Sequence, residues 1–177
     1  MKKIMQVLSI IFTIFFVVFV IIYQYYSKGY ILSLAITFGV FSYHLLIRFI
    51  IGYVIDGIFH NKMDYTKKWF KVNKVENKIY LFLKVNKWKK HIPTYSPETF
   101  SLKHHSLEEI IQATCQSEIV HELIFIFSYL PILLTIFFDS FLVFLITSII
   151  ASLIDLTFVI VQRYNRPRLI RLLTRKK

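Results

Sequence analysis

Long apolar runs dominate the hydrophobic pattern of this 177-residue chain. A helix needs about 20 apolar residues to cross about 30 Å of hydrocarbon. Four stretches reach or approach that length, so we predict transmembrane helices at about residues 4–26, 30–59, 119–138 and 140–161. The first follows two lysines, as a signal peptide would. Its apolar run is too long and no small-residue cleavage site follows, so we interpret it as a retained anchor.

Composition supports the lipid bilayer as the solvent of this chain. The chain is 56% hydrophobic and carries a formal charge of +12. A soluble domain this apolar could not cover its surface, and a nucleic-acid-binding protein would not contain such long uncharged runs. We therefore predict an all-α integral membrane protein with a single membrane domain over residues 1–177. A basic interfacial loop occupies residues 60–105, and a basic tail occupies residues 163–177.

The distribution of basic residues predicts the orientation of the helices. Two lysines precede the first span, eleven lie between the second and third, and seven lysines or arginines follow the fourth. The two short connections between spans contain only Lys28. Because basic residues are retained in the cytoplasm, we expect a multi-pass protein of the cell membrane with the loop and both termini cytoplasmic.

The basic loop contains many aromatic and aliphatic residues. Trp69, Phe70, Tyr80 and Trp88 lie among its lysines. Such a segment either lies on an anionic membrane surface, with lipid headgroups as its partners, or covers a pocket at the membrane interface. Both interpretations remain open from the sequence.

A capping-box pattern marks the start of the next helix. Ser106 precedes Glu109 by three residues, so a helix should begin near Leu107 and continue into the third span. This helix carries Glu118 and His121 into the cytoplasmic interface.

Glu118 and His121 are three residues apart and share a helical face. A carboxylate beside an imidazole can hold its tautomer and raise its basicity, which suits a general base acting on a hydroxyl. The alternative is an interfacial helix whose polar face happens to contain both residues. We expect no metal site, because the Glu-x-x-His pattern occurs only once and no second cluster completes a coordination shell.

Other ionisable residues lie within the predicted spans, where each needs a partner. Arg48 could neutralise Asp56 or Asp155, or its side chain could reach the interface from the end of the second span. His44, one turn earlier, is expected to pack rather than to catalyse.

The end of the fourth span is rich in polar groups. A short connection makes the third and fourth spans antiparallel neighbours, so Glu118 and His121 should lie at the depth of Gln162, Arg163, Asn165 and Arg166. The guanidinium groups could bind phosphates of an acyl donor or stabilise an oxyanion. Pro167 should stop the helix near Arg166.

Three segments carry a resemblance to a known family. The sequences "VQRYNRPRL" in the last span, "SEIVH" in the third and "NKWKKHIP" in the loop resemble the glycosyl-4,4'-diaponeurosporenoate acyltransferases of staphyloxanthin biosynthesis. The resemblance begins near Tyr65. In that family a further Glu and an Arg often stand at the positions of Ala113 and Gln116, and a Pro at that of Thr157, so this chain departs from the pattern there.

The resemblance implies a membrane enzyme that esterifies a sugar hydroxyl of a glycosylated carotenoid acid with a fatty acyl group. His121 and Glu118 would be catalytic, and five residues would bind substrate: Trp88, Gln162, Arg163, Asn165 and Arg166. We expect no bound cofactor, with acyl-CoA or another activated acyl group as donor and pathway enzymes as possible partners. The alternative is a non-enzymatic immunity or assembly factor that binds anionic lipid or a partner protein.

Overall fold

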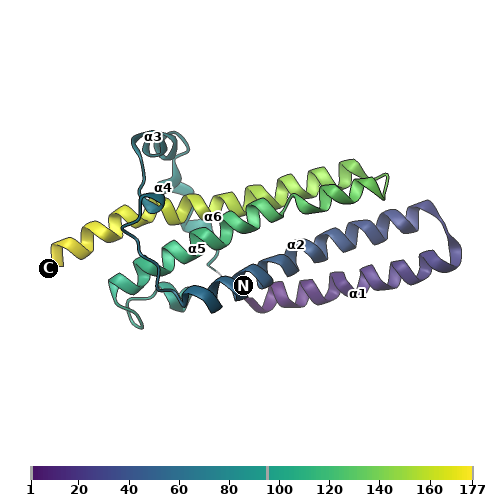
Figure 1. The fold of residues 1–177 in the computed structure, drawn as a ribbon, viewed down its shortest axis with the longest axis horizontal. Helices are drawn as coiled ribbons and strands as arrows, with labels where there is room; N and C mark the ends of the chain where they lie inside the picture. The colour runs from purple at the N-terminus through teal and green to yellow at the C-terminus, as the bar shows by residue number, and fades with distance from the viewer. Residues whose placement is uncertain (1, 95, 177) are drawn as a thin grey trace. The chain divides into compact units, whose positions relative to one another are not determined.

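The computed structural model describes residues 2–94 and 96–176, and these form helices and connecting turns without a strand (Figure 1). Four helical segments are long and apolar enough to cross a membrane. They begin with α1 (Lys2–Tyr26) and α2 (Gly29–Phe59). The third combines α5 (Leu107–Phe127) with the 3₁₀ segment η4 (Leu130–Ile136), and the fourth is α6 (Phe141–Lys176). The predicted all-helical, four-span membrane protein is confirmed.

The loop between α2 and α5 folds into short helices. These are η1 (Lys68–Phe70), α3 (Lys74–Phe82), α4 (Val85–Trp88), η2 (Lys89–His91) and η3 (Pro97–Phe100). Asn73 and Glu76 form a capping box at the start of α3. This reciprocal pair satisfies backbone N–H groups that would otherwise lack partners.

The predicted start of α5 is confirmed. Glu109 Oε2 accepts hydrogen bonds from the Ser106 backbone and hydroxyl at 2.7 and 2.9 Å. The Ser106 hydroxyl in turn accepts from the Glu109 backbone N–H at 3.3 Å. These bonds form the predicted capping box, and the helix begins at Leu107.

The expectation that Pro167 stops the last helix is wrong. Pro167 lies inside α6, which continues to Lys176. Proline removes one intrahelical hydrogen bond, to the carbonyl four residues earlier. The sequence that follows it is rich in arginine and leucine, which favour helix, so the basic tail extends α6.

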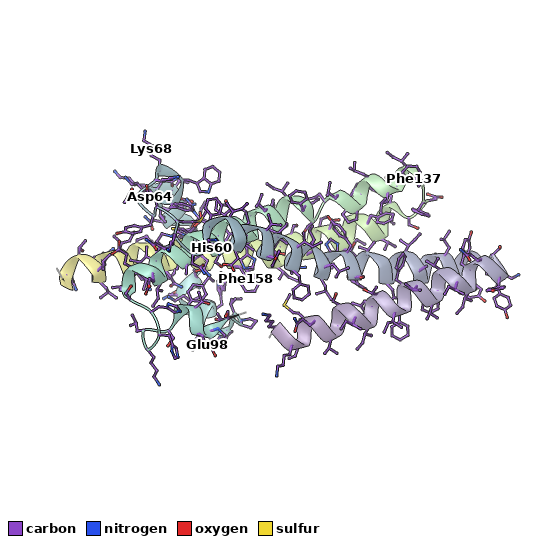
Figure 2. All side chains as sticks on the ribbon, turned by 60° about the horizontal axis from the view of Figure 1, so that its bottom comes forward. His60, Asp64, Lys68, Glu98, Phe137 and Phe158 are labelled. Carbon is purple, nitrogen blue, oxygen red and sulfur yellow. The ribbon has the colours of Figure 1, made fainter. Side chains whose placement is uncertain are left out.

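The chain divides into two compact units, which we describe separately. The first contains Met1–Ile51 and Ile124–Ile154. Within it α1 packs against α2 through stacked aromatic rings. The centre of the Phe38 ring lies 5.0 Å from that of Phe15 and 5.5 Å from that of Phe19. Many apolar side chains face outward, as Phe137 does in Figure 2. Such an exposed apolar surface suits contact with lipid.

The second unit contains Gly52–Leu123 and Asp155–Lys177. Here the basic loop packs on α5, because Met63 and Phe70 form a buried cluster with Cys115. Other loop side chains remain exposed, including those of Val75, Leu81 and Phe82. The loop therefore covers part of α5, and its adhesion to an anionic membrane surface stays a prediction. All the contacts of the candidate site described below lie in this unit.

Candidate active site on α5 and α6

A buried carboxylate on α5 is bound by two arginines from α6. Glu118 is fully buried, and its Oε1 lies 2.5 Å from Arg163 Nη1 while its Oε2 lies 2.5 Å from Arg166 Nη2. The two arginines are three residues apart and share a helical face. The predicted proximity of Glu118 to these arginines is confirmed. The predicted pairing of Glu118 with His121 is wrong, because both Glu118 oxygens contact guanidinium groups.

Arg166 is enclosed by its hydrogen bonds. Its Nε donates to Thr114 Oγ1 at 3.0 Å, its Nη2 to the Thr114 carbonyl at 3.0 Å and its Nη1 to the Phe70 carbonyl at 3.2 Å. The guanidinium also lies 5.0 Å from the centre of the Phe70 ring and is fully buried. To bind a donor phosphate it would have to leave Glu118, so we assign Arg166 a structural role in holding the loop on α5 and α6.

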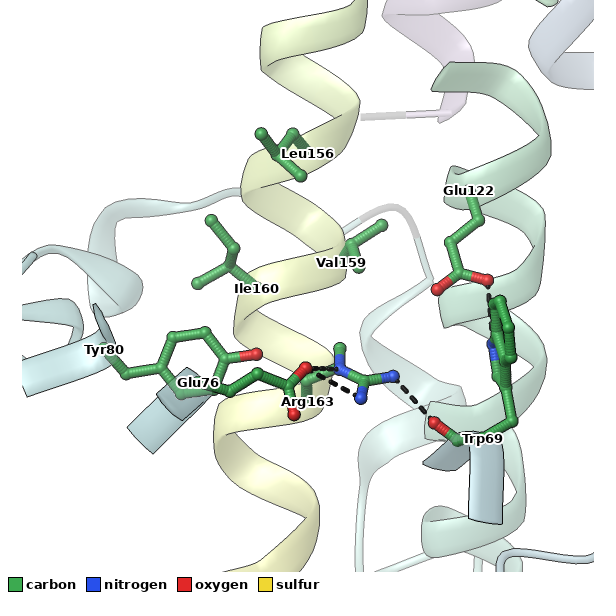
Figure 3. Close-up of a pocket in the computed structure, with 8 residues that line it drawn as sticks. All are labelled: Trp69, Glu76, Tyr80, Glu122, Leu156, Val159, Ile160 and Arg163. Atoms are coloured by element: carbon green, nitrogen blue, oxygen red, sulfur yellow. Dashed lines mark hydrogen bonds and ion pairs between the residues drawn. The ribbon is translucent and has the colours of Figure 1, made fainter. Parts of the chain in front are cut away.

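Arg163 joins α6 to the basic loop. Its Nε donates to Glu76 Oε1 at 2.8 Å, and its Nη1 donates to the Trp69 carbonyl at 2.9 Å (Figure 3). With the bond to Glu118, this guanidinium contacts two carboxylates. Its positive charge is therefore already neutralised, which disfavours the expected binding of a donor phosphate.

The carboxylate partner of His121 is Asp155. His121 Nδ1 lies 2.9 Å from Asp155 Oδ1, and Asp155 is fully buried. The imidazole stacks on Phe158 with the ring centres 4.5 Å apart and the planes inclined by 10°. Its side chain is 18% exposed, and its Nε2 makes no hydrogen bond with any residue that the structure describes.

This geometry favours one tautomer of the neutral imidazole. A carboxylate at Nδ1 accepts the Nδ1–H and leaves the lone pair on Nε2. Stacking on Phe158 limits rotation of the ring. His121 is thus held with a proton acceptor at Nε2, which is the arrangement that a general base requires.

The other residues expected to bind substrate have local partners. Gln162 Nε2 donates to Ser117 Oγ at 3.1 Å, and Asn165 Oδ1 accepts from Lys89 Nζ at 2.5 Å. Trp88 Nε1 donates to the Leu83 carbonyl at 2.9 Å, within the loop. These contacts position α6 and the loop but do not test the expected roles in substrate binding.

The polar groups at the end of α2 have partners as well. Gln116 Nε2 donates to Asp56 Oδ1 at 3.0 Å, and Gln116 Oε1 accepts from the Asn61 backbone N–H at 2.7 Å. Arg48 donates to the backbone carbonyls of His44 and Ala151. The pairing of Arg48 with Asp56 or Asp155 stays a prediction.

A pocket of about 370 Å³ lies beside Arg163 (Figure 3). Its apolar wall comes from Leu156, Val159 and Ile160, which share one face of α6 with Arg163. The rest of the lining is Trp69, Glu76, Tyr80 and Glu122. Neither Trp88 nor His121 belongs to the lining.

None of the last four pocket residues was expected from the sequence to be a site residue. Glu122 carried a signal, since it is an ionisable group close to a predicted span. Trp69, Glu76 and Tyr80 come from η1 and α3, and only the folding of the loop brings them to α6. Burial raises the pKa of the Tyr80 phenol above its ordinary value, so its hydroxyl remains a donor at neutral pH.

Metal-ligating side chains do not cluster in the described part of the chain. No group of three or more His, Cys, Asp or Glu residues there could hold a metal ion. The expected absence of a metal site and of a bound cofactor stays a prediction.

Comparison with known proteins places the chain in a family. The sequence model described as glycosyl-4,4'-diaponeurosporenoate acyltransferase matches residues 66–175, more than half of the chain. No curated protein and no solved structure matches. The matched segment contains His121, Asp155, Glu118 and both of its arginines. The chain therefore belongs to the glycosyl-4,4'-diaponeurosporenoate acyltransferase family.

Proposed function

We propose that the protein is a membrane-bound acyltransferase that esterifies a sugar hydroxyl of glycosyl-4,4'-diaponeurosporenoate, or a related glycolipid, with a fatty acyl group. The observation that carries the proposal is the pairing of the partly exposed His121 with the buried Asp155, in the segment that matches the family. An ionisable carboxyl group within a membrane-spanning helix needs a functional or structural reason. Orienting His121 as the base for a hydroxyl acceptor would be such a reason for Asp155.

His121 would act as the general base of a direct transfer. Its Nε2 takes the proton from the acceptor hydroxyl as the hydroxyl oxygen attacks the acyl carbonyl carbon. The new ester C–O bond forms, and the bond from the acyl carbon to its leaving group breaks. With acyl-CoA as donor, the leaving thiolate receives the proton from His121. Asp155 would hold the tautomer whose proton lies on Nδ1 before the step and stabilise the imidazolium during it.

Glu118 is assigned a supporting role in this scheme. It holds Arg163 and Arg166, and these anchor the loop beside α5 and α6. We therefore expect Glu118 to act through folding rather than as a direct partner of the base.

The orientation in the cell membrane is part of the proposal. The excess of basic residues in the loop and at both ends favours a cytoplasmic location for all three. The acyl donor and the acceptor head group would then meet the enzyme at the cytoplasmic surface.

Cysteine labelling tests this orientation. The only native cysteine, Cys115, is buried, so background labelling should be low. We expect a membrane-impermeant thiol reagent to label Lys28→Cys in intact cells, but Lys103→Cys only after permeabilisation. Both native side chains are exposed. Labelling of Lys103→Cys in intact cells would contradict the proposed orientation.

The function itself is tested by comparing the lipids of cells with and without this protein, in a host that makes the glycosylated carotenoid acid. We expect mass spectrometry to detect a sugar-linked fatty acyl ester only when the protein is present. Identical lipids, with the protein inserted in the membrane, would instead favour the non-enzymatic alternative.

A further inference from the structure

Glu122 differs from the other carboxylates of the candidate site. Glu118 and Glu76 contact arginines, and Asp155 contacts His121. Among the described residues, no cation lies within ion-pair distance of Glu122. Its carboxylate accepts one hydrogen bond, from Trp69 Nε1 at 3.0 Å. A half-buried carboxylate on a candidate membrane helix therefore retains acceptor capacity.

This acceptor capacity is directed at a pocket. Glu122 and Trp69 both line the cavity beside Arg163, and their side chains meet at one edge of it (Figure 3). The hydrogen bond from the indole fixes the ring relative to the carboxylate. A flat aromatic face next to a carboxylate can pack against the C–H groups of a sugar ring while accepting hydrogen bonds from its hydroxyls.

The charges around the pocket argue against an anionic ligand. Among the lining residues that the structure describes, Arg163 is the one basic residue, and it is already bound to Glu76 and Glu118. Glu122 adds a further acidic group, and no described cation lies within ion-pair distance of it. A phosphate or carboxylate head group would meet this carboxylate without gaining a free cation.

The remaining wall is apolar and belongs to a membrane-spanning helix. Leu156, Val159 and Ile160 follow one face of α6 away from Arg163. The pocket thus combines polar groups near the loop with a hydrocarbon surface along the span. This combination suits an amphiphile whose head group is polar and uncharged and whose tail is a hydrocarbon.

We propose that this pocket binds the hydroxyl-bearing head group of the acceptor, a neutral glycolipid-like amphiphile. Glu122 accepts hydrogen bonds from the head-group hydroxyls, Trp69 packs against the ring, and the apolar wall contacts the start of the tail. The proposal rests on the proposed function for the choice of a hydroxyl acceptor. It concerns binding alone, since His121 lies outside the lining.

Direct binding to the purified full-length protein in lipid nanodiscs tests this proposal. The probe is a radiolabelled long-chain alkyl glucoside, with the alkyl phosphate and alkyltrimethylammonium of equal chain length as competitors. We expect saturable binding of the glucoside and weak competition by the two charged amphiphiles. Equal or better competition by either one would overturn the proposal of a neutral head group.

Variants identify the pocket as the binding site. Glu122→Gln should weaken glucoside binding roughly tenfold or more, because one carboxylate oxygen is replaced by an amide N–H donor and the remaining oxygen is a weaker acceptor. Leu156→Phe should also weaken binding, since it fills the pocket from a half-exposed position on α6. Glu108→Gln makes the same charge change at an exposed position of α5 and should bind like wild type. Wild-type binding by both pocket variants would overturn the assignment.

The His121→Ala variant separates this inference from the proposed function. It should bind the glucoside like wild type although acyl transfer is lost. If wild type transfers acyl groups but binds no glucoside in the pocket, the inference fails and the proposed function stands. If the pocket binds as expected but no acyl transfer occurs, the proposed function fails.

Discussion

Replacing His121 with alanine should lower the rate of acyl transfer by roughly two to four orders of magnitude, the usual contribution of a positioned general base. The loss follows from removal of the imidazole, whose Nδ1 lies 2.9 Å from the buried Asp155 carboxylate and whose Nε2 would accept the proton. Initial rates in membranes containing equal amounts of inserted protein measure it. The exposed loop histidine His104 provides the matched control, and His104→Ala should keep the wild-type rate.

The companion variant Asp155→Asn tests whether Asp155 sets the position of the proton on the His121 ring or only packs beside the ring. An amide of the same shape can donate to Nδ1 and so place the imidazole proton on Nε2, where it blocks the base. We expect the rate to fall by at least tenfold while the protein still inserts and elutes as a single species. Wild-type rates for both His121→Ala and Asp155→Asn would exclude this pair from the reaction.

Replacing Glu118 with leucine should destabilise the folded protein by about 3–5 kcal/mol, because removal of one partner leaves buried charge uncompensated. Here the guanidinium groups of Arg163 and Arg166 would lose the carboxylate that they share, and Arg166 is fully buried. Thermal unfolding in detergent micelles measures the effect. The exposed carboxylate Glu98 is the control, and Glu98→Leu should leave the melting temperature close to that of wild type.

A double variant tests the cause of this destabilisation. Adding Arg166→Met to Glu118→Leu removes the buried unpaired charge and should recover part of the lost stability. If Glu118 assisted catalysis directly, its replacement would lower acyl transfer and leave the melting temperature unchanged. If Glu118→Leu melts like wild type and loses only acyl transfer, the structural role assigned to Glu118 is wrong.

The secondary structure was largely predictable because its determinants are local. Apolar run length predicted the four spans, and the Ser106–Glu109 pair predicted where α5 begins. The antiparallel arrangement of the last two spans also predicted that Glu118 would lie near Arg163 and Arg166. Each of these inferences needs only helical periodicity or a short connection.

The partners within the site depend on features that one sequence does not contain. Glu118 and His121 are separated by about 60° around α5, and the rotation of α5 against α6 decides which carboxylate each contacts. In the structure, Glu118 contacts the two arginines and Asp155 contacts His121. The pocket depends on contacts between residues that are far apart in the sequence, such as Glu76 and Arg163, which are 87 positions apart.

Reconstituted acyl transfer tests the proposed chemistry most directly. Purified protein in nanodiscs is given glycosyl-4,4'-diaponeurosporenoate and isotope-labelled fatty acyl-CoA, or the fatty acid on an acyl carrier protein. We predict that wild-type protein forms a labelled ester on the sugar and that His121→Ala forms essentially none. Equal rates for the two proteins, or no ester from wild type with either donor, would contradict a transfer catalysed by the His121–Asp155 pair.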